Sequence, residues 1–134
     1  MCGKVTYTAT GLKPGLSACH CGMCRRWAGG AFLATPTDSL AWQGDEHITT
    51  FKSSDWAERG FCSLCGSSLF YRVTAPGPHH GVVTIAFGTL DDQSGFEMTS
   101  EWFIDNKPDA YTFAGERTKL TQAEAIAMFG GGES

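Results

Sequence analysis

Apolar and polar positions alternate in short stretches along the chain, and this pattern predicts a series of β-strands. The stretches recur about every ten residues, a spacing typical of antiparallel β proteins. The clearest strand pattern is GVVTIAFG at 81–88. Turn-forming residues at 13–15, 35–39 and 75–81 separate the stretches as turns or loops. Further strands are predicted over 2–9, 30–35, 47–52, the second half of 61–74, and 97–104.

Helical periodicity appears only near the C-terminal end of the chain. Thr121 and Glu124 form a capping box, apolar residues follow it, and Gly130 supplies a stop signal. We therefore predict a mainly β fold with antiparallel sheets, long irregular loops and one short C-terminal helix. Residues 1–130 are predicted to form a single domain, and residues 131–134 a disordered tail.

Charge and composition narrow the classes of function. The chain of 134 residues has a formal net charge of −4, and its ten Lys and Arg residues are scattered apart from Arg25-Arg26. This charge argues against a surface that binds nucleic-acid phosphates. No apolar run approaches the roughly 20 residues of a membrane helix, and the N-terminus lacks the regions of a signal peptide. We therefore expect a cytoplasmic protein without nucleic-acid or membrane partners, in which six cysteines favour metal or redox chemistry over disulfides.

The cysteines occur in three groups whose spacing is typical of metal ligands. Cys62-x-x-Cys65 is followed by Gly66, which can adopt a positive φ and let backbone N–H groups turn toward a metal-bound sulfur, as in a zinc knuckle. A redox pair of the thioredoxin type would need a βαβ setting, which the pattern does not predict. In an extended Cys19-x-Cys21 segment both sulfurs point the same way, and a turn can bring Cys24 back to them.

Two zinc arrangements follow from this spacing. In the first, Cys21, Cys24, Cys62 and Cys65 close one tetrathiolate site, and the remaining cysteines are bystanders. In the second, a triplet with an open fourth position and a separate knuckle site together use all six cysteines, namely Cys19, Cys21 and Cys24 in one and Cys2, Cys62 and Cys65 in the other. A third interpretation is that some of the triplet cysteines are buried, unreactive thiols.

The chain resembles the glutathione-dependent formaldehyde-activating enzyme family, which has the Mss4-like fold. The resemblance covers nearly the whole chain, and the ordered set of motifs is more specific than any one Cys-x-x-Cys. The matching stretches are CGKVTY at 2–7, CHCGMCRRWAGG at 19–30, FKSSDWAERGFCSLCGSSLFY at 51–71, GTLDD at 88–92 and WFIDNKPDAY at 102–111.

The resemblance implies roles for the cysteines. It assigns the triplet Cys19, Cys21 and Cys24 to a catalytic zinc, and Cys2, Cys62 and Cys65 to a structural zinc. The family's N-terminal motif is Cys-x-Cys-Gly, and its first cysteine would precede Met1 here. The fourth ligand of the structural site is therefore undefined: water, an imported side chain, the terminal amine or an empty site are the alternatives. We accordingly expect the native protein to start further upstream.

The implied reaction is the addition of glutathione to formaldehyde. A zinc with three protein ligands keeps a position for substrate, and a thiol bound there is deprotonated yet remains nucleophilic. Attack on formaldehyde would give S-hydroxymethylglutathione, and the reverse reaction would make the protein a carbon–sulfur lyase. Because an arginine fork suits a carboxylate, Arg25 or Arg26 is predicted to bind glutathione, against the alternative that both pair with local acidic residues.

A non-catalytic module of the Mss4-like fold, with one structural tetrathiolate zinc, is the competing function, and a zinc or thiol sensor is a third. The cysteine triplet favours the enzyme, because a binding module needs only the two Cys-x-x-Cys pairs.

His20 is predicted to be a donor behind the ligands or an exposed residue rather than a ligand. Ser53, Ser54 and Arg59 are candidate pocket residues because they lie in a matched motif. The actual thiol and aldehyde, and the oligomeric state, stay open.

Overall fold

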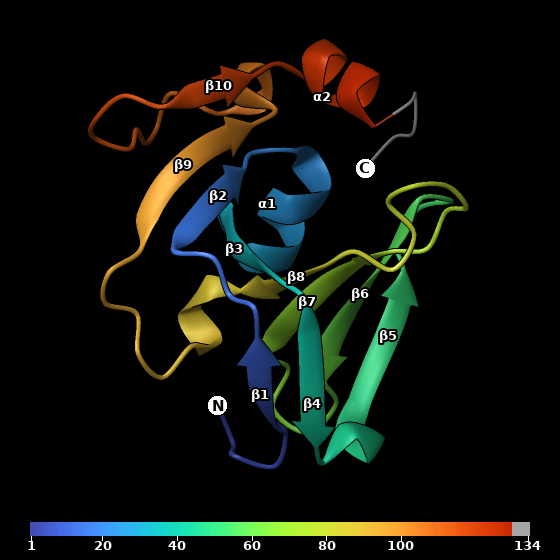
Figure 1. Cartoon of the computed structure of the whole chain (residues 1–134). Helices are drawn as coiled ribbons and strands as arrows, with labels where there is room; N and C mark the ends of the chain where they lie inside the picture. The colour runs from blue at the N-terminus through green and yellow to red at the C-terminus, as the bar shows by residue number, and fades with distance from the viewer. Residues whose placement is uncertain (130–134) are drawn as a thin grey trace.

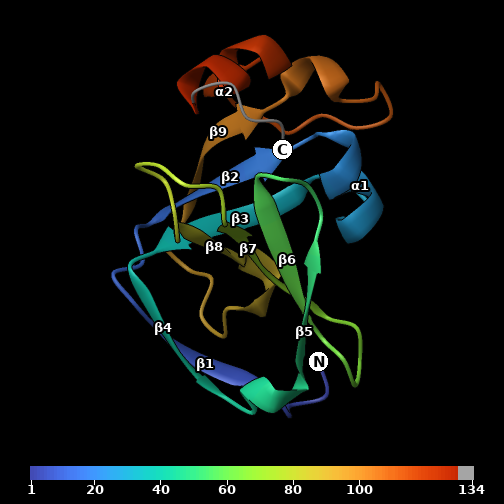
Figure 2. The same cartoon turned by 90° about the vertical axis from the view of Figure 1, so that its right-hand side faces the viewer.

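The computed structural model describes residues 1–129, and within them two β-sheets and two α-helices carry the fold (Figures 1 and 2). Eight strands form one sheet in the order β10-β9-β2-β3-β8-β7-β6-β5, and β1 pairs with β4 in a separate ribbon. The predicted mainly β fold with a short C-terminal helix is confirmed. The strands are β1 (Thr6–Thr10), β2 (Gly15–Cys19), β3 (Phe32–Thr37), β4 (Ser39–Gln43), β5 (Ile48–Lys52), β6 (Ala57–Cys62), β7 (Ser68–Val73), β8 (Val83–Ala86), β9 (Glu97–Trp102) and β10 (Thr118–Leu120).

The strand prediction is correct for the segments 47–52, 81–88 and 97–104, which contain β5, β8 and β9. The segment 35–39, predicted as a loop, is instead mostly strand. Pairing explains the difference, because Thr37 lies opposite Val83 of β8 and Ser39 lies opposite Thr10 of β1. The sheet is also not wholly antiparallel, since β9 runs parallel to both β2 and β10.

Two α-helices lie in the described residues, and only one of them is predicted by the sequence. Helix α2 (Gln122–Met128) begins as expected, with the Thr121 side chain accepting a hydrogen bond from the Glu124 N–H at 3.2 Å. The predicted stop at Gly130 and tail at 131–134 lie outside the described residues. Helix α1 (Gly22–Ala28) is not predicted, because Cys21 stands at its N-cap in place of the Ser, Thr, Asp or Asn that usually marks a helix start. Three 3₁₀ turns are η1 (Asp45–His47), η2 (Phe87–Thr89) and η3 (Ile104–Asn106).

The hydrophobic core has two parts on either side of the strongly twisted sheet region around β8. One part gathers around α1, where Cys24, Phe32 and Phe103 are buried and Ala125 of α2 packs against them. The other lies under the β1–β4 ribbon, and its buried members are Cys62, Leu69, Phe70, Ile85 and Leu90. The molecule thus has an upper end formed by α1, β9 and α2, and a lower end formed by the ribbon and η1 (Figure 1). No helix in residues 1–129 has both the length and the apolar character that crossing a membrane requires.

Gly60 in β6 is required by close packing, and we expect its replacement by alanine to destabilise the fold. A Cβ atom at Gly60 would lie 2.3 Å from the ring of Phe70, which is 1% exposed and has no free space to move into. Overpacking of this kind costs about 1–3 kcal/mol of unfolding free energy. Denaturant unfolding of Gly60→Ala measures it, with Gly30→Ala as control because a Cβ there meets no atom within 4 Å. Equal stability of the two variants would contradict the prediction.

Candidate metal centre

Three cysteines converge where β2 passes into α1. Cys19 ends β2, Cys21 is the N-cap residue of α1, and Cys24 lies in the first turn of that helix. Their three sulfur atoms all lie within 4.8 Å of one another. A zinc ion with Zn–S bonds of about 2.3 Å in tetrahedral geometry places sulfurs about 3.8 Å apart. The donor set is that of a zinc site, and the sulfurs are close to the spacing that zinc requires.

Local hydrogen bonds explain why the chain turns into a helix at this point. The Cys21 side chain takes the place of a capping hydroxyl, because its Sγ accepts a hydrogen bond from the Cys24 N–H at 3.4 Å. The helix ends at Gly29, whose φ of 79° lets its N–H return to the Arg25 carbonyl. The expected turn after Cys21 is thus the first turn of α1, and it returns the Cys24 sulfur to the other two.

The three thiols differ in acidity, because the pKa of Cys21 is lowered whereas the pKa values of Cys19 and Cys24 are raised. Hydrogen bonds from Cys19 and Cys24, helped by the nearby Arg59 charge, lower the pKa of Cys21 to about 2. Hydrogen bonds with the Cys21 and Cys24 sulfurs, together with burial, raise the pKa of Cys19. A thiolate among three close sulfurs is the electronic arrangement that a divalent metal ligand set needs.

Arg59 of β6 is the charged residue that touches the cluster. Its side chain is 3% exposed, and its Nη1 donates a hydrogen bond to Cys24 Sγ at 3.4 Å. The guanidinium carbon lies 5.1 Å from the ring centroids of both Trp27 and Tyr71. Burial raises the pKa of Tyr71, so its hydroxyl keeps its proton beside this charge. Sequence reasoning included Arg59 among the pocket candidates, but only the structure places it on the cysteines.

His20 is buried behind the cluster rather than exposed. Its ring bridges two elements, with Nε2 2.8 Å from Glu101 Oε1 and Nδ1 2.9 Å from the Tyr111 hydroxyl. Arg117 Nη1 donates to the other oxygen of Glu101 at 2.7 Å. Because the sulfurs of Cys19 and Cys21 point to the opposite side, this network holds the segment between β2 and α1 from behind. The prediction that His20 is not a ligand agrees with this placement.

We expect Glu101→Gln to be destabilising at neutral pH and nearly neutral in acid. Burial works to raise the pKa of Glu101, but the hydrogen bonds from Arg117 and His20 outweigh it and hold the pKa below its usual 4.5. The charged form therefore stabilises the fold above about pH 4.5, and this contribution is lost as the pH falls through the lowered pKa. The expected difference in unfolding free energy at pH 7 is about 1.5–3 kcal/mol.

Denaturant unfolding of wild type and Glu101→Gln across pH 3–7 checks this expectation, because contributions common to both proteins cancel in the difference. Glu97→Gln is the matched control, since Glu97 lies on the same strand but is exposed. A difference that keeps its pH 7 value down to pH 3 would rule out the titration of Glu101 as its cause.

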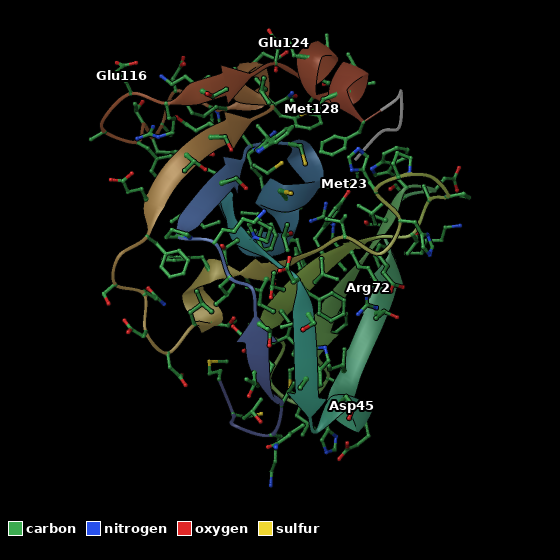
Figure 3. The ribbon with its side chains drawn as sticks, in the orientation of Figure 1. Met23, Asp45, Arg72, Glu116, Glu124 and Met128 are labelled. Carbon is green, nitrogen blue, oxygen red and sulfur yellow. The ribbon has the colours of Figure 1, made fainter. Side chains whose placement is uncertain are left out.

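The second cluster lies at the opposite end of the molecule. Cys2, Cys62 and Cys65 have their sulfurs within 4.8 Å of one another, and the Cys2–Cys62 distance is 3.8 Å. The turn between β6 and β7 forms the predicted knuckle: Gly66 has φ of 80° and its N–H bonds to the Cys62 carbonyl at 2.8 Å. In Figure 3, Met23 of α1 marks the end with the first cluster, and Asp45 of η1 marks the end with the second, where Ser63 bonds to His47.

The single closed site of Cys21, Cys24, Cys62 and Cys65 does not form in this fold. Cys21 and Cys24 belong to the core around α1, whereas Cys62 is buried in the core under the β1–β4 ribbon. Each half of that site joins a different third cysteine. At the second cluster, the Met1 amino group donates to Ser67 Oγ at 3.1 Å, and that oxygen lies 3.2 Å from Cys65 Sγ.

The first cluster opens onto a cavity of about 700 Å³ that lies over the large sheet. Cys19 and Cys24 line it, together with Arg59 and Tyr71, and its exposed wall is mostly apolar. Register explains one side of the cavity, because four lining residues stand opposite one another across neighbouring strands, namely Arg59, Tyr71, Thr84 and Pro36. The volume lies within the range of small-molecule sites, which is about 300–1,000 Å³.

The other predicted substrate-binding residues lie outside the described lining of this cavity. Arg25 Nε donates to the His20 carbonyl at 3.0 Å, and Arg26 Nη1 donates to the Gly22 carbonyl at 3.1 Å. Neither guanidinium lies within 4 Å of a carboxylate in residues 1–129, so the structure gives no support to local acidic pairing. Their binding of glutathione stays a prediction. Ser53 and Ser54 instead bond to the backbone of the turn before β6.

Comparison with known proteins places this arrangement in context. The chain is 29% identical over 127 residues to an uncharacterized lyase of Schizosaccharomyces pombe, covering 94% of this chain and 90% of the relative. It is 32% identical over 79 residues to a Halomonas elongata protein provisionally named a glutathione-dependent formaldehyde-activating enzyme, covering 52% of this chain and 50% of that protein.

A crystal structure of a Rhodobacter sphaeroides protein shares the fold, with a TM-score of 0.55 and 21% sequence identity over 67% of this chain and 83% of that one. The family profile for the glutathione-dependent formaldehyde-activating enzyme matches residues 1–106, a range that contains both cysteine clusters, Arg59 and most of the cavity wall. The chain therefore belongs to the glutathione-dependent formaldehyde-activating enzyme family.

Proposed function

We propose that this protein is a zinc-dependent carbon–sulfur lyase that forms and cleaves the adduct of a glutathione-type thiol with formaldehyde or a similar small electrophile. The observation that carries the proposal is the position of the triplet Cys19, Cys21 and Cys24 at the wall of a cavity large enough for a small molecule. Three protein ligands leave one coordination position of zinc free, as in catalytic rather than structural sites. Family membership and the name of the yeast relative support a lyase.

Zinc held by the triplet would deprotonate the thiol of the substrate and keep its sulfur nucleophilic. The chain's own residues would prepare that sulfur for reaction. Cys19 and Cys24 lie at the cavity wall together with the apolar side chains of Phe32 and Trp102, so a thiol in the cavity would reach a metal held by these sulfurs. Lys13 lines the same cavity and supplies a positive charge for a carboxylate of glutathione. Arg25 and Arg26 stay candidate ligands for its other carboxylate.

Arg59 would offset the negative charge of the loaded centre. Three thiolates and one Zn²⁺ carry a net charge of −1, and a substrate thiolate makes it −2. The Arg59 guanidinium contacts Cys24 and is buried. Its positive charge would therefore offset part of this negative charge in a region where water screens charges poorly. The second cluster, formed by Cys2, Cys62 and Cys65, would hold a structural zinc that ties the N-terminal segment to the β6–β7 turn.

Exchange spectroscopy by NMR tests the proposed activity. The rate at which formaldehyde and glutathione interconvert with S-(hydroxymethyl)glutathione is measured with and without the zinc-loaded protein. We expect a rate that rises in proportion to protein concentration, falls to the buffer rate after chelation, and returns on addition of zinc. A zinc-loaded protein that leaves the exchange rate unchanged would contradict the proposal for this pair of substrates and would favour a non-catalytic module.

A further inference from the structure

Arg59 has hydrogen-bonding capacity that the protein leaves unused. Its Nε and Nη2 atoms are buried and have no hydrogen-bond partner in the described residues, while Nη1 bonds to Cys24 Sγ. A buried charged donor without a partner is costly, and native proteins rarely keep one without a role. The side chain is 3% exposed and yet lines the cavity, so the cavity is where a partner can reach it.

The surroundings of Arg59 hold its guanidinium in one place. The Trp27 and Tyr71 rings lie at equal distances from it, which favours a cation by the interaction of charge with aromatic faces. Arg59 also stands opposite Tyr71 in the register of β6 and β7, on a strand that is paired on both sides rather than on a loop. Its free N–H groups are therefore preorganised before any ligand enters.

We propose that Arg59 is the oxyanion site of this cavity and binds the oxygen on the carbon that bonds to the substrate sulfur. The inference rests on the proposed function. Arg59 already contacts Cys24, and a substrate sulfur at the open position of the same centre would be a neighbour of Cys24. An oxygen on the attached carbon would then be close to the Arg59 Nε and Nη2 donors that have no partner in the described residues.

The reaction step balances with this assignment. As the substrate sulfur forms its bond to the carbonyl carbon, the electron pair of the carbon–oxygen π bond moves onto oxygen, which becomes an alkoxide against Arg59. The alkoxide takes a proton from water, which replaces the proton that the thiol released. In reverse, Arg59 stabilises the same alkoxide while the carbon–sulfur bond breaks. Donors aimed at a charge that develops in the transition state are worth on the order of 100-fold or more in rate.

The ligand class that follows is a molecule with sulfur and an anionic oxygen on one carbon. Thioacetate has this S–C–O unit in stable form, and ethanethiol has the same two-carbon skeleton and sulfur without the oxygen. We expect Arg59→Met to lower the ratio of thioacetate to ethanethiol affinity about tenfold, because hydrogen bonds between charged groups are lost. Titration calorimetry on zinc-loaded protein measures both affinities. Comparing the ratio of the two affinities between variants cancels the effect of the different acidities of the two ligands.

Two further variants keep the test interpretable. Arg59→Lys keeps the charge and should keep part of the preference for thioacetate, even if Arg59→Met folds poorly. Arg72→Met is the matched control, because Arg72 lies on β7 over the Phe70 ring and pairs with Glu58 at 2.8 Å, outside this cavity (Figure 3). Zinc content and thermal unfolding of each variant show whether it is folded.

Each outcome decides the inference. A ratio that falls in Arg59→Met, is partly kept in Arg59→Lys and is unchanged in Arg72→Met supports the oxyanion site. An unchanged ratio in Arg59→Met overturns it and leaves the proposed function standing. If Arg59→Met weakens the binding of glutathione but not that of its dimethyl ester, Arg59 binds a carboxylate of glutathione, and the assignment is wrong. If neither glutathione nor its dimethyl ester binds the zinc-loaded wild type, the proposed function fails and the inference fails with it.

Discussion

Replacing Cys19 by serine is expected to remove one of two zinc ions and to bring the exchange rate close to the uncatalysed one. Cys19 supplies one of three sulfurs at the cavity wall, and a hydroxyl is a much poorer zinc ligand than a thiolate. Loss of a residue that merely orients a ligand lowers metal affinity or activity by about 10–100-fold, so loss of the ligand itself should cost more. Native mass spectrometry counts the zinc ions, and NMR exchange measures the rate.

Ser17→Ala is the matched control for this variant, because Ser17 lies two residues earlier on β2 and lines the same cavity. It should keep both zinc ions and a rate near that of the wild type. A wild type that binds a single zinc, retained in Cys19→Ser, would contradict the expectation. It would mean that the triplet holds no zinc and that the single ion lies at the second cluster of Cys2, Cys62 and Cys65, which favours a binding module over an enzyme.

Replacing Cys62 by serine is expected to remove the other zinc and to lower the free energy of unfolding by more than about 3 kcal/mol. The reason is that structural zinc contributes about 10–16 kcal/mol of binding free energy that is coupled to folding. Cys62 is 2% exposed and lies in the core under the β1–β4 ribbon, so the variant also leaves a polar group buried there. Denaturant unfolding with zinc present measures the loss. The rate per folded molecule at low temperature should remain near that of the wild type, because the first cluster is untouched.

Leu64→Ser is the control for the knuckle, since Leu64 lies between the two ligands but is 55% exposed and is not a ligand. Its stability should stay within about 0.5 kcal/mol of the wild type. If Cys62→Ser is no less stable than Leu64→Ser, the second cluster does not hold a structural metal.

Local sequence patterns determined the elements whose stability arises from short-range contacts. The capping box at Thr121 and Glu124 placed the start of α2 correctly, because a side-chain hydrogen bond three residues away defines it. The strand-like run at 81–88 identified β8, in which the neighbouring residues Ile85 and Ala86 are both buried. The two groups of cysteines were separable by spacing and by resemblance, but spacing alone also allowed one closed site.

Long-range pairing decided what these patterns could not. Helix α1 exists because Cys24 and Trp27 pack against β3, and β4 exists because β1 pairs with it across a distant stretch of sequence. The candidate ligands, the mainly β class and the C-terminal helix could thus be predicted from local patterns and resemblance. Only the tertiary structure placed Arg59, 35 residues beyond Cys24, against that sulfur. The physical reason is that strand register sets which side chains share a cavity, and register depends on pairing between residues far apart in the chain.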